Sequence, residues 1–167
     1  MSDESTERRL TSGWHGRFYK DFKLGDVYKH PYGRTITETD DVWITNVTMN
    51  LNPMHFNEPY AACTEFGERL VNGLYTMSLA VGLTIPDTTD GTIVANLSYD
   101  DVEHPNPVFH GDTIYARTTV LDKHETSDGD RGVVTMRVEA FKVEPDGGDD
   151  TLVCELERTA LSLRRPE

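Results

Sequence analysis

The sequence predicts an α+β fold in which an antiparallel sheet wraps around one long buried helix. The longest apolar segment, Gly73 to Ile85, is apolar on almost every side, so a helix formed by it would be buried on almost every side. Four later segments alternate apolar and polar residues, are rich in β-branched side chains and are separated by turn signals. Long strands that curl around the helix would bury its apolar surface.

The N-terminal part of the chain is expected to enter this fold through a short strand. Residues 1–12 are polar and charged, and we expect them to be disordered, which leaves residues 13–165 for a single domain. The aromatic-rich segment 14–28 predicts an ordered entry into the first strand. Pro31 and Gly33 then mark a turn.

Two helices are predicted ahead of the apolar one. The Thr37 hydroxyl and a carboxylate three residues later have the spacing of a capping box, which predicts a helix over residues 38–48. We expect Asp41, on this helix, to face solvent. Residues 58–65 predict a second, shorter helix with Asn57 as its N-cap.

Proline is expected to end the central helix, and turns divide the strands that follow. Pro86 comes directly after Ile85, and a helix interior tolerates proline poorly. The predicted strands cover residues 92–102, 113–123, 132–143 and 151–164.

The composition is that of an acidic chain of one domain's length. Its 167 residues include 29 Asp and Glu against 16 Lys and Arg, and a net charge of -13 would repel a nucleic-acid backbone. This acid-rich, lysine-poor composition suggests adaptation to concentrated salt, and an ordinary acidic protein is the alternative. We see neither a secretion signal nor a membrane span, so we expect a cytoplasmic protein with no membrane partner.

Several classes of chemistry find no support in the sequence. It contains no phosphate-binding glycine loop, no paired Cys-x-x-Cys and no histidine spacing typical of a metal site, so we expect neither metal nor cofactor. The two cysteines, Cys63 and Cys154, lie in apolar runs and are expected to be small core residues rather than nucleophiles.

A polar segment after the first predicted helix is the first candidate site. Asn50 and Asn52 lead through Pro53 to His55, and a proline-constrained loop can hold such side chains rigidly. His55 can both accept and donate a proton near neutrality. The alternative is that the asparagines cap backbone groups and that His55 is an ordinary loop histidine.

The start of the central helix is the second candidate. A helix N-terminus leaves N–H groups without partners and carries a partial positive charge. Gly73 has no side chain, so a ligand oxygen could approach its N–H as in an oxyanion hole. The simpler alternative is that Asn72 is an N-cap followed by glycine.

A third polar segment, residues 105–112, joins two predicted strands. His110 within it could belong to a site, or it could be part of the structural turn that Gly111 and Asp112 indicate.

Together the three segments resemble the MaoC-like, or R-specific enoyl-CoA hydratase, family. The family pattern Asp-x-Asn-Pro-hydrophobic-His, followed by a small residue, matches Asn50 to His55 and then Ala61. The polar-Gly-hydrophobic start of its central helix matches Asn72 to Leu74, and its Pro-Val-x-x-Gly-Asp matches Pro107 to Asp112. These motifs keep the family's order, and the resemblance covers roughly residues 15–163.

The resemblance implies a hot-dog fold, a homodimer or higher homo-oligomer, and a coenzyme A thioester as substrate. The residues it carries over as catalytic are His55, Asn50 and Gly73. The candidates for substrate binding are Asn52, Asn72, Arg34 and His110.

One departure from the family pattern concerns its catalytic Asp, which falls on Asn50. An amide cannot take a proton, but it can hydrogen-bond a water and would not repel a substrate that carries its own carboxylate. The residues around it look like the branch that hydrates mesaconyl-CoA or itaconyl-CoA. A second substrate carboxylate would favour an arginine partner, for which the candidates are Arg34, Arg17 and Arg69.

The resemblance therefore implies a hydro-lyase that reversibly hydrates an α,β-unsaturated acyl-CoA, specifically mesaconyl-CoA to β-methylmalyl-CoA. One alternative is a general R-specific enoyl-CoA hydratase. A second is a hot-dog thioesterase with Glu65 or Glu68 as its base, and a third is an acyl-CoA binding module without catalysis.

Overall fold

The structure is a computed structural model that describes residues 16–144 and 146–165. The predicted disordered segment, residues 1–12, lies outside the described residues. In chain order the elements are η1 (Tyr19–Asp21), β1 (Val27–Lys29), β2 (Arg34–Thr35), α1 (Glu38–Val47), α2 (Glu58–Ala61), α3 (Gly73–Thr88), β3 (Ile93–Glu103), β4 (Thr113–Glu125), β5 (Arg131–Lys142) and β6 (Thr151–Leu163).

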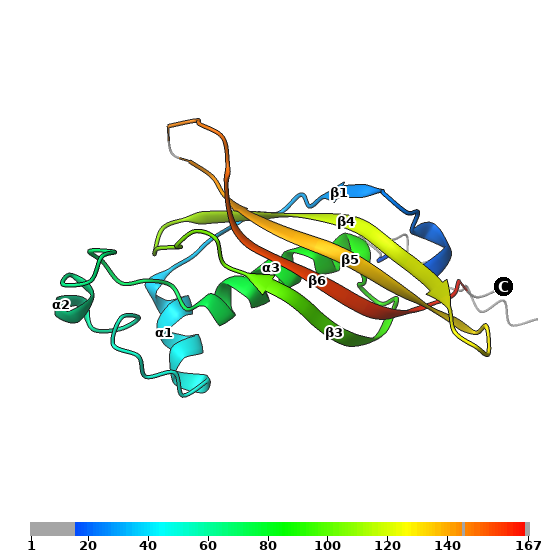
Figure 1. Ribbon diagram of the computed structural model, residues 1–167, viewed down its shortest axis with the longest axis horizontal. Coiled ribbons are helices and arrows are strands. Elements are labelled where there is room, and N and C mark those ends of the chain that lie inside the picture. The colour runs from blue at the N-terminus through cyan, green and yellow to red at the C-terminus, as the bar shows by residue number, and fades with distance from the viewer. Residues whose placement is uncertain (1–15, 145, 166–167) are drawn as a thin grey trace, which may run out of the picture.

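The sheet is antiparallel and curves over α3 (Figure 1). Its strands lie in the order β1-β4-β5-β6-β3, and the short β2 also pairs with β4. The predicted architecture, an antiparallel sheet wrapped around one central helix, is confirmed. The long strands begin and end within two residues of their predicted bounds, because turn residues and the alternating pattern define both ends.

The core lies on the inner face of the sheet, against α3 at one end and against the segment that precedes β1 at the other. Along β5, buried and half-buried residues alternate, as expected for a strand with one face on a core. Val134, Met136 and Val138 lie on its buried face, and Leu156 of β6 is also fully buried. Burying each such side chain stabilises the fold by about 1.5–3 kcal/mol. Val138 and Leu156 share a cluster with residues of α3, whereas Val134 and Met136 pack with aromatic residues that precede β1.

One face of α3 is exposed, which corrects the prediction that the helix is buried on nearly all sides. Ala80 and Leu83 pack into the core beneath the sheet. Leu74, Ser78 and Gly82 are exposed, and their spacing of four residues aligns them in one stripe. The sheet curves over only one side of the helix, and apolar composition alone cannot report that (Figure 1).

Pro86 lies inside α3, which extends to Thr88, so the predicted helix end at Ile85 is wrong. A proline removes one helical hydrogen bond and crowds the carbonyl four residues earlier, which here belongs to Gly82. Gly82 is exposed, and a Cβ added there would meet nothing within 4 Å, so this carbonyl has room to adjust.

The helices before α3 begin where predicted. The capping box of α1 is confirmed, because Thr37 Oγ1 accepts the Asp40 N–H and the Asp40 carboxylate accepts the Thr37 N–H. The Asn57 side chain caps α2, also as predicted. α2 is shorter than predicted, because the Thr64 hydroxyl donates to the Ala61 carbonyl and competes with the next helical bond.

The two cysteines differ in their surroundings. Cys154, on β6, is buried as predicted, and burial raises the pKa of its thiol to about 11, which argues against a nucleophile. Cys63 is exposed, so the expectation that it is a core residue is wrong. In its Ala-Ala-Cys run only Ala61 packs inward, because the chain beyond α2 runs along the surface.

Among the described residues, no helix is both long enough and apolar enough to cross a membrane.

Candidate active site

His55 is held in a fixed orientation by the backbone of the loop that enters α3. Its Nδ1 lies 2.7 Å from the Leu70 carbonyl oxygen, and because a carbonyl only accepts, Nδ1 carries a proton. The other ring nitrogen, Nε2, therefore carries the lone pair when the ring is neutral. His55 is only 7% exposed, so its ring is enclosed by the fold, and the bond to Leu70 fixes one ring edge.

The two asparagines before His55 shape its loop. Asn52 Oδ1 accepts the Met54 N–H at 3.2 Å, and the Asn52 carbonyl accepts the His55 N–H at 3.1 Å. Asn50 Oδ1 lies 3.4 Å from the Asn52 N–H that it accepts. Such local bonds are typical of Asn in turns, and they set the position from which His55 extends.

The N-terminus of α3 presents a free backbone donor. The Asn72 side chain caps the helix, because its Oδ1 accepts the Leu74 N–H at 3.0 Å. Asn72 is buried, and its Nδ2 has no hydrogen-bond partner within the described part of the chain. The Gly73 N–H likewise has no partner among those residues, so it can donate to a bound oxygen at the positive end of the helix.

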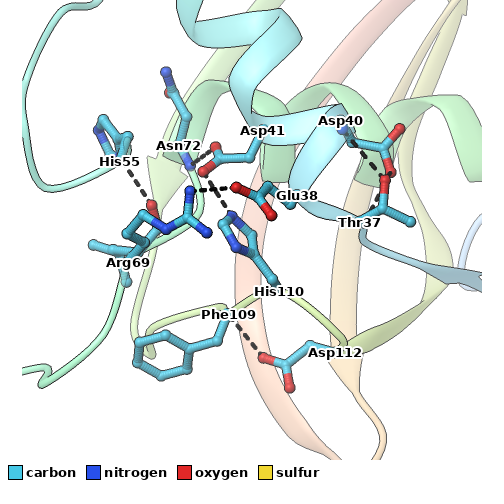
Figure 2. A network of polar contacts seen from close by, with 11 residues as sticks. Thr37, Glu38, Asp40, Asp41, His55, Arg69, Asn72, Phe109, His110 and Asp112 are labelled. Atoms are coloured by element: carbon cyan, nitrogen blue, oxygen red, sulfur yellow. Dashed lines mark hydrogen bonds and ion pairs between the residues drawn. The ribbon is translucent and has the colours of Figure 1, made fainter. Parts of the chain in front are cut away.

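The buried carboxylate of Asp41 also holds the start of α3 in place. Asp41 of α1 is 0% exposed, which corrects the prediction that it faces solvent. Its Oδ1 accepts the Asn72 N–H at 2.8 Å, and its Oδ2 accepts the Nε2–H of His110 at 2.9 Å. Figure 2 shows the carboxylate between these two partners. Since Asn72 immediately precedes Gly73, this network holds the free N–H in place.

A cavity of about 360 Å³ brings the two predicted groups together. The described residues that line it are His55, Phe66, Leu70, Val71, Gly73, Thr76, His104, Pro105, Asn106, Pro107, Val108 and Val153. Most of this lining is apolar, and its few polar groups converge in a way typical of a small-molecule site. Within this described lining there is no Asp, Glu, Lys or Arg.

The arginines proposed for a substrate carboxylate lie elsewhere. Arg34 lines a different cavity, beside α1 and the exposed face of α3, and pairs with Asp40 at 2.6 Å. Arg69 pairs with Glu38 at 2.6 Å, and this hydrogen bond and charge lower the pKa of the Glu38 carboxyl. Arg17 donates to the Asp87 carbonyl, near the far end of α3.

The sequence pattern of the MaoC like domain family matches residues 21–142, which is most of the chain. The chain belongs to the MaoC-like family. The match includes the His55 loop, the Gly73 helix start and the His110 turn, so all of the described cavity lining except Val153 lies within the matched residues.

Three curated relatives of this MaoC-like chain have the names of hydratases or dehydratases. The mesaconyl-CoA hydratase of Cereibacter sphaeroides is 31% identical over 82% of the chain and 38% of its own length. The β-methylmalyl-CoA dehydratase of Chloroflexus aurantiacus is 30% identical over 88% of the chain and 44% of its own length. The (R)-specific enoyl-CoA hydratase of Rhodospirillum rubrum is 32% identical over 62% of the chain and 69% of its own length. The chain thus spans less than half the length of the first two relatives.

Solved structures share the fold. The monoamine oxidase regulatory protein of Archaeoglobus fulgius aligns over 90% of the chain and 97% of its own, with a TM-score of 0.77 and 27% identity. A Mycobacterium tuberculosis protein with a double hot-dog fold aligns over 91% of the chain and 46% of its own, with a TM-score of 0.76 and 22% identity. The MaoC-like chain therefore has the hot-dog fold that the sequence motifs implied.

Two residues of this site were not predicted from the sequence. Asp41 was expected at the surface, and no sequence motif gave His104 a role, yet His104 lines the cavity beside Gly73. The loop containing Pro105 and Pro107 is a local signal that could have drawn attention to His104, because it resembles the proline-constrained loop of His55.

Proposed function

We propose that the chain is a hydro-lyase that reversibly adds water to the double bond of an α,β-unsaturated acyl-CoA thioester. The observation that carries the proposal is that His55 and Gly73 line one apolar cavity, and that neither Nε2 of His55 nor the N–H of Gly73 has a partner among the described residues. Membership in the MaoC-like family and the hydratase and dehydratase names of the relatives support it.

In the proposed reaction the Gly73 N–H donates to the thioester carbonyl oxygen. Nε2 of His55 takes a proton from a water while the water oxygen bonds to Cβ. The electrons of the double bond move to the carbonyl, and the resulting enolate is stabilised by the N–H and the positive helix end. Protonation of Cα completes the addition. Each such acid–base group contributes about 10²–10⁴-fold in rate.

The remaining predicted site residues take supporting roles in this proposal. Asn52 shapes the His55 loop, while Asn72 and His110 fix the start of α3 through Asp41. Asn50 is outside the described lining of the cavity, and its Oδ1 is engaged by the Asn52 N–H. Its part in holding the attacking water stays a prediction.

For the acyl group we propose mesaconyl-CoA, hydrated to β-methylmalyl-CoA. Relatives of this name cover most of the chain, which supports the choice. The described lining of the cavity contains no arginine to pair with a second substrate carboxylate, so a partner protomer or a shift of Arg69 would have to supply one. A general enoyl-CoA hydratase, whose substrate has no second carboxylate, is the alternative that fits a described lining without arginine.

The substrate is tested by following the absorbance of the enoyl-thioester with mesaconyl-CoA and crotonyl-CoA in parallel, in buffer with molar KCl. Fast loss with mesaconyl-CoA and little with crotonyl-CoA is the expected result. Loss with crotonyl-CoA alone would replace the proposed substrate by a simple enoyl-CoA. No loss with either, from folded protein, would contradict the hydratase and leave a binding module.

Thioester cleavage is less well supported by this cavity. A hot-dog thioesterase would need a carboxylate base, and the candidates Glu65 and Glu68 are both exposed and outside the described lining. Titration of free thiol during the same assay separates the two reactions, because hydration releases none.

We also propose that the protein is a homodimer joined through β3. This strand is the edge of the described sheet, and its 11 residues remain mostly exposed. Val94, Leu97, Tyr99 and Val102 are exposed on it. A long apolar edge is prone to pair with another strand, and β3 of a second copy is complementary to it.

A further inference from the structure

A second histidine lies in the cavity with His55, and the mechanism above gives it no task. His104 follows β3 directly and precedes Pro105, so its loop is constrained. A Cβ added to Gly73 would lie 3.3 Å from His104 Nε2 and 3.5 Å from two of its ring carbons. The imidazole therefore rests against Gly73, in the space that a side chain at that position would fill.

This place next to Gly73 brings His104 close to the reacting atoms. A thioester oxygen bound to the Gly73 N–H would lie about 3 Å from that nitrogen. An imidazole in contact with the same glycine is then within reach of the thioester and of the Cα bonded to its carbonyl carbon. No carboxylate in the described lining competes for this task.

Hydration needs two proton movements, one from the attacking water and one to Cα. His55 Nε2 can accept the first proton, but the family's second group, an Asp, is replaced by Asn50, whose amide does not titrate. His104 is the other imidazole in the described lining of the cavity, and an imidazole can donate a proton near neutrality.

We propose that His104 is a second catalytic residue, the acid that delivers the proton to Cα; this rests on the proposed hydratase function. The water oxygen bonds to Cβ, its proton goes to neutral His55, and the π electrons form the enolate. Protonated His104 then gives its Nε2 proton to Cα as the enolate electrons form the new C–H bond. Solvent takes the proton from His55 and returns one to His104. In dehydration the two roles reverse.

The test compares His104→Gln and His104→Phe with wild type on the enoyl-CoA that wild type hydrates. The glutamine side chain can still form hydrogen bonds but cannot donate a proton as an acid. The phenylalanine side chain keeps an aromatic ring but forms no hydrogen bonds. We expect kcat to fall by about 10²-fold or more in both variants, with KM within about threefold. We also expect the alkaline limb of the kcat–pH profile, where the acid loses its proton, to disappear.

His124→Gln is the matched control, because the His124 side chain is 63% exposed and lies on β4 away from the cavity. It should retain wild-type kcat and pH profile, and circular dichroism should show that all variants fold. If His104→Gln keeps kcat within about threefold, or keeps the alkaline limb, His104 is not the acid. If wild type hydrates no enoyl-CoA, the hydratase proposal fails and this one fails with it, and the wild-type assay alone identifies that case.

Discussion

At the scale of single residues, the buried carboxylate of Asp41 links α1 to the N-terminal end of α3. Its two oxygens accept the Asn72 N–H and the His110 Nε2–H, so a neutral replacement weakens both bonds. We expect Asp41→Asn to lower the free energy of unfolding by about 1–3 kcal/mol, as measured by urea denaturation. Asp90→Asn, an exposed carboxylate beyond the other end of α3, should change it little. An equal free energy of unfolding for Asp41→Asn and Asp90→Asn would contradict a supporting role for Asp41.

The same residue shows which parts of the site the sequence could predict. His55 and Gly73 carry local signals, a proline-constrained loop and a glycine at a helix start, and both line the cavity. Asp41 acts on partners 31 and 69 residues away, and no local spacing reports such contacts. His104 reaches Gly73 only because the end of β3 lies beside the start of α3 in the folded chain.

At the scale of elements, a buried histidine joins the far end of α3 to the sheet. His30 follows β1, and its ring bonds Asp87 of α3 through Nδ1 at 2.6 Å and Thr118 of β4 through Nε2 at 2.7 Å. Burial lowers the pKa of His30 and outweighs the opposing attraction of Asp87. The folded state therefore binds fewer protons than the unfolded state, in which the pKa is about 6.5.

Stability should fall as the pH drops from above 6.5 toward the lower pKa of folded His30, because protonation then favours the unfolded chain. We expect the melting temperature of His30→Gln to depend less on pH between about 7 and 5 than that of wild type. The variant will be less stable than wild type at pH 7, since it loses two hydrogen bonds. The informative quantity is therefore the slope of the melting temperature against pH. Identical slopes in calorimetry would show that His30 does not titrate on unfolding.

Strand bounds and helix starts were predictable, whereas helix ends and the surroundings of each element were not. Alternation and turn residues defined the four long strands, and Thr37 and Asn57 defined two helix starts. The exposed stripe of α3 and the accommodation of Pro86 depend on which side of the helix the curved sheet covers. That curvature is a property of the assembled sheet rather than of any one segment.

At the scale of the whole molecule, the exposed edge strand predicts the oligomeric state. Leu97 on β3 is 53% exposed, and a charge there would disfavour strand pairing with a second copy. We expect wild type to sediment as a dimer and Leu97→Asp as a monomer. Leu24→Asp is the control, because Leu24 is 62% exposed and lies just before β1, near the opposite edge of the sheet. A monomeric wild type, or a dimeric Leu97→Asp, would refute pairing through β3.

The surplus of acidic residues predicts a dependence on salt. With 29 acidic against 16 basic residues, repulsion within the folded chain weakens as the Debye length shortens from about 10 Å at 0.1 M to about 3 Å at 1 M salt. We expect the free energy of unfolding and the activity to rise between low salt and molar KCl. A protein equally stable and active without salt would be an ordinary acidic protein.

The central claim is that the cavity holding His55 and Gly73 performs the hydration, and His55→Ala tests it most directly. The measurement is kcat for hydration of the preferred enoyl-CoA, with circular dichroism and sedimentation to confirm fold and assembly. Since His55 is the proposed base, we predict a loss of about 10²–10⁴-fold in kcat from a variant that remains folded. A folded His55→Ala protein that keeps most of the wild-type rate would contradict the claim and place the chemistry outside this cavity.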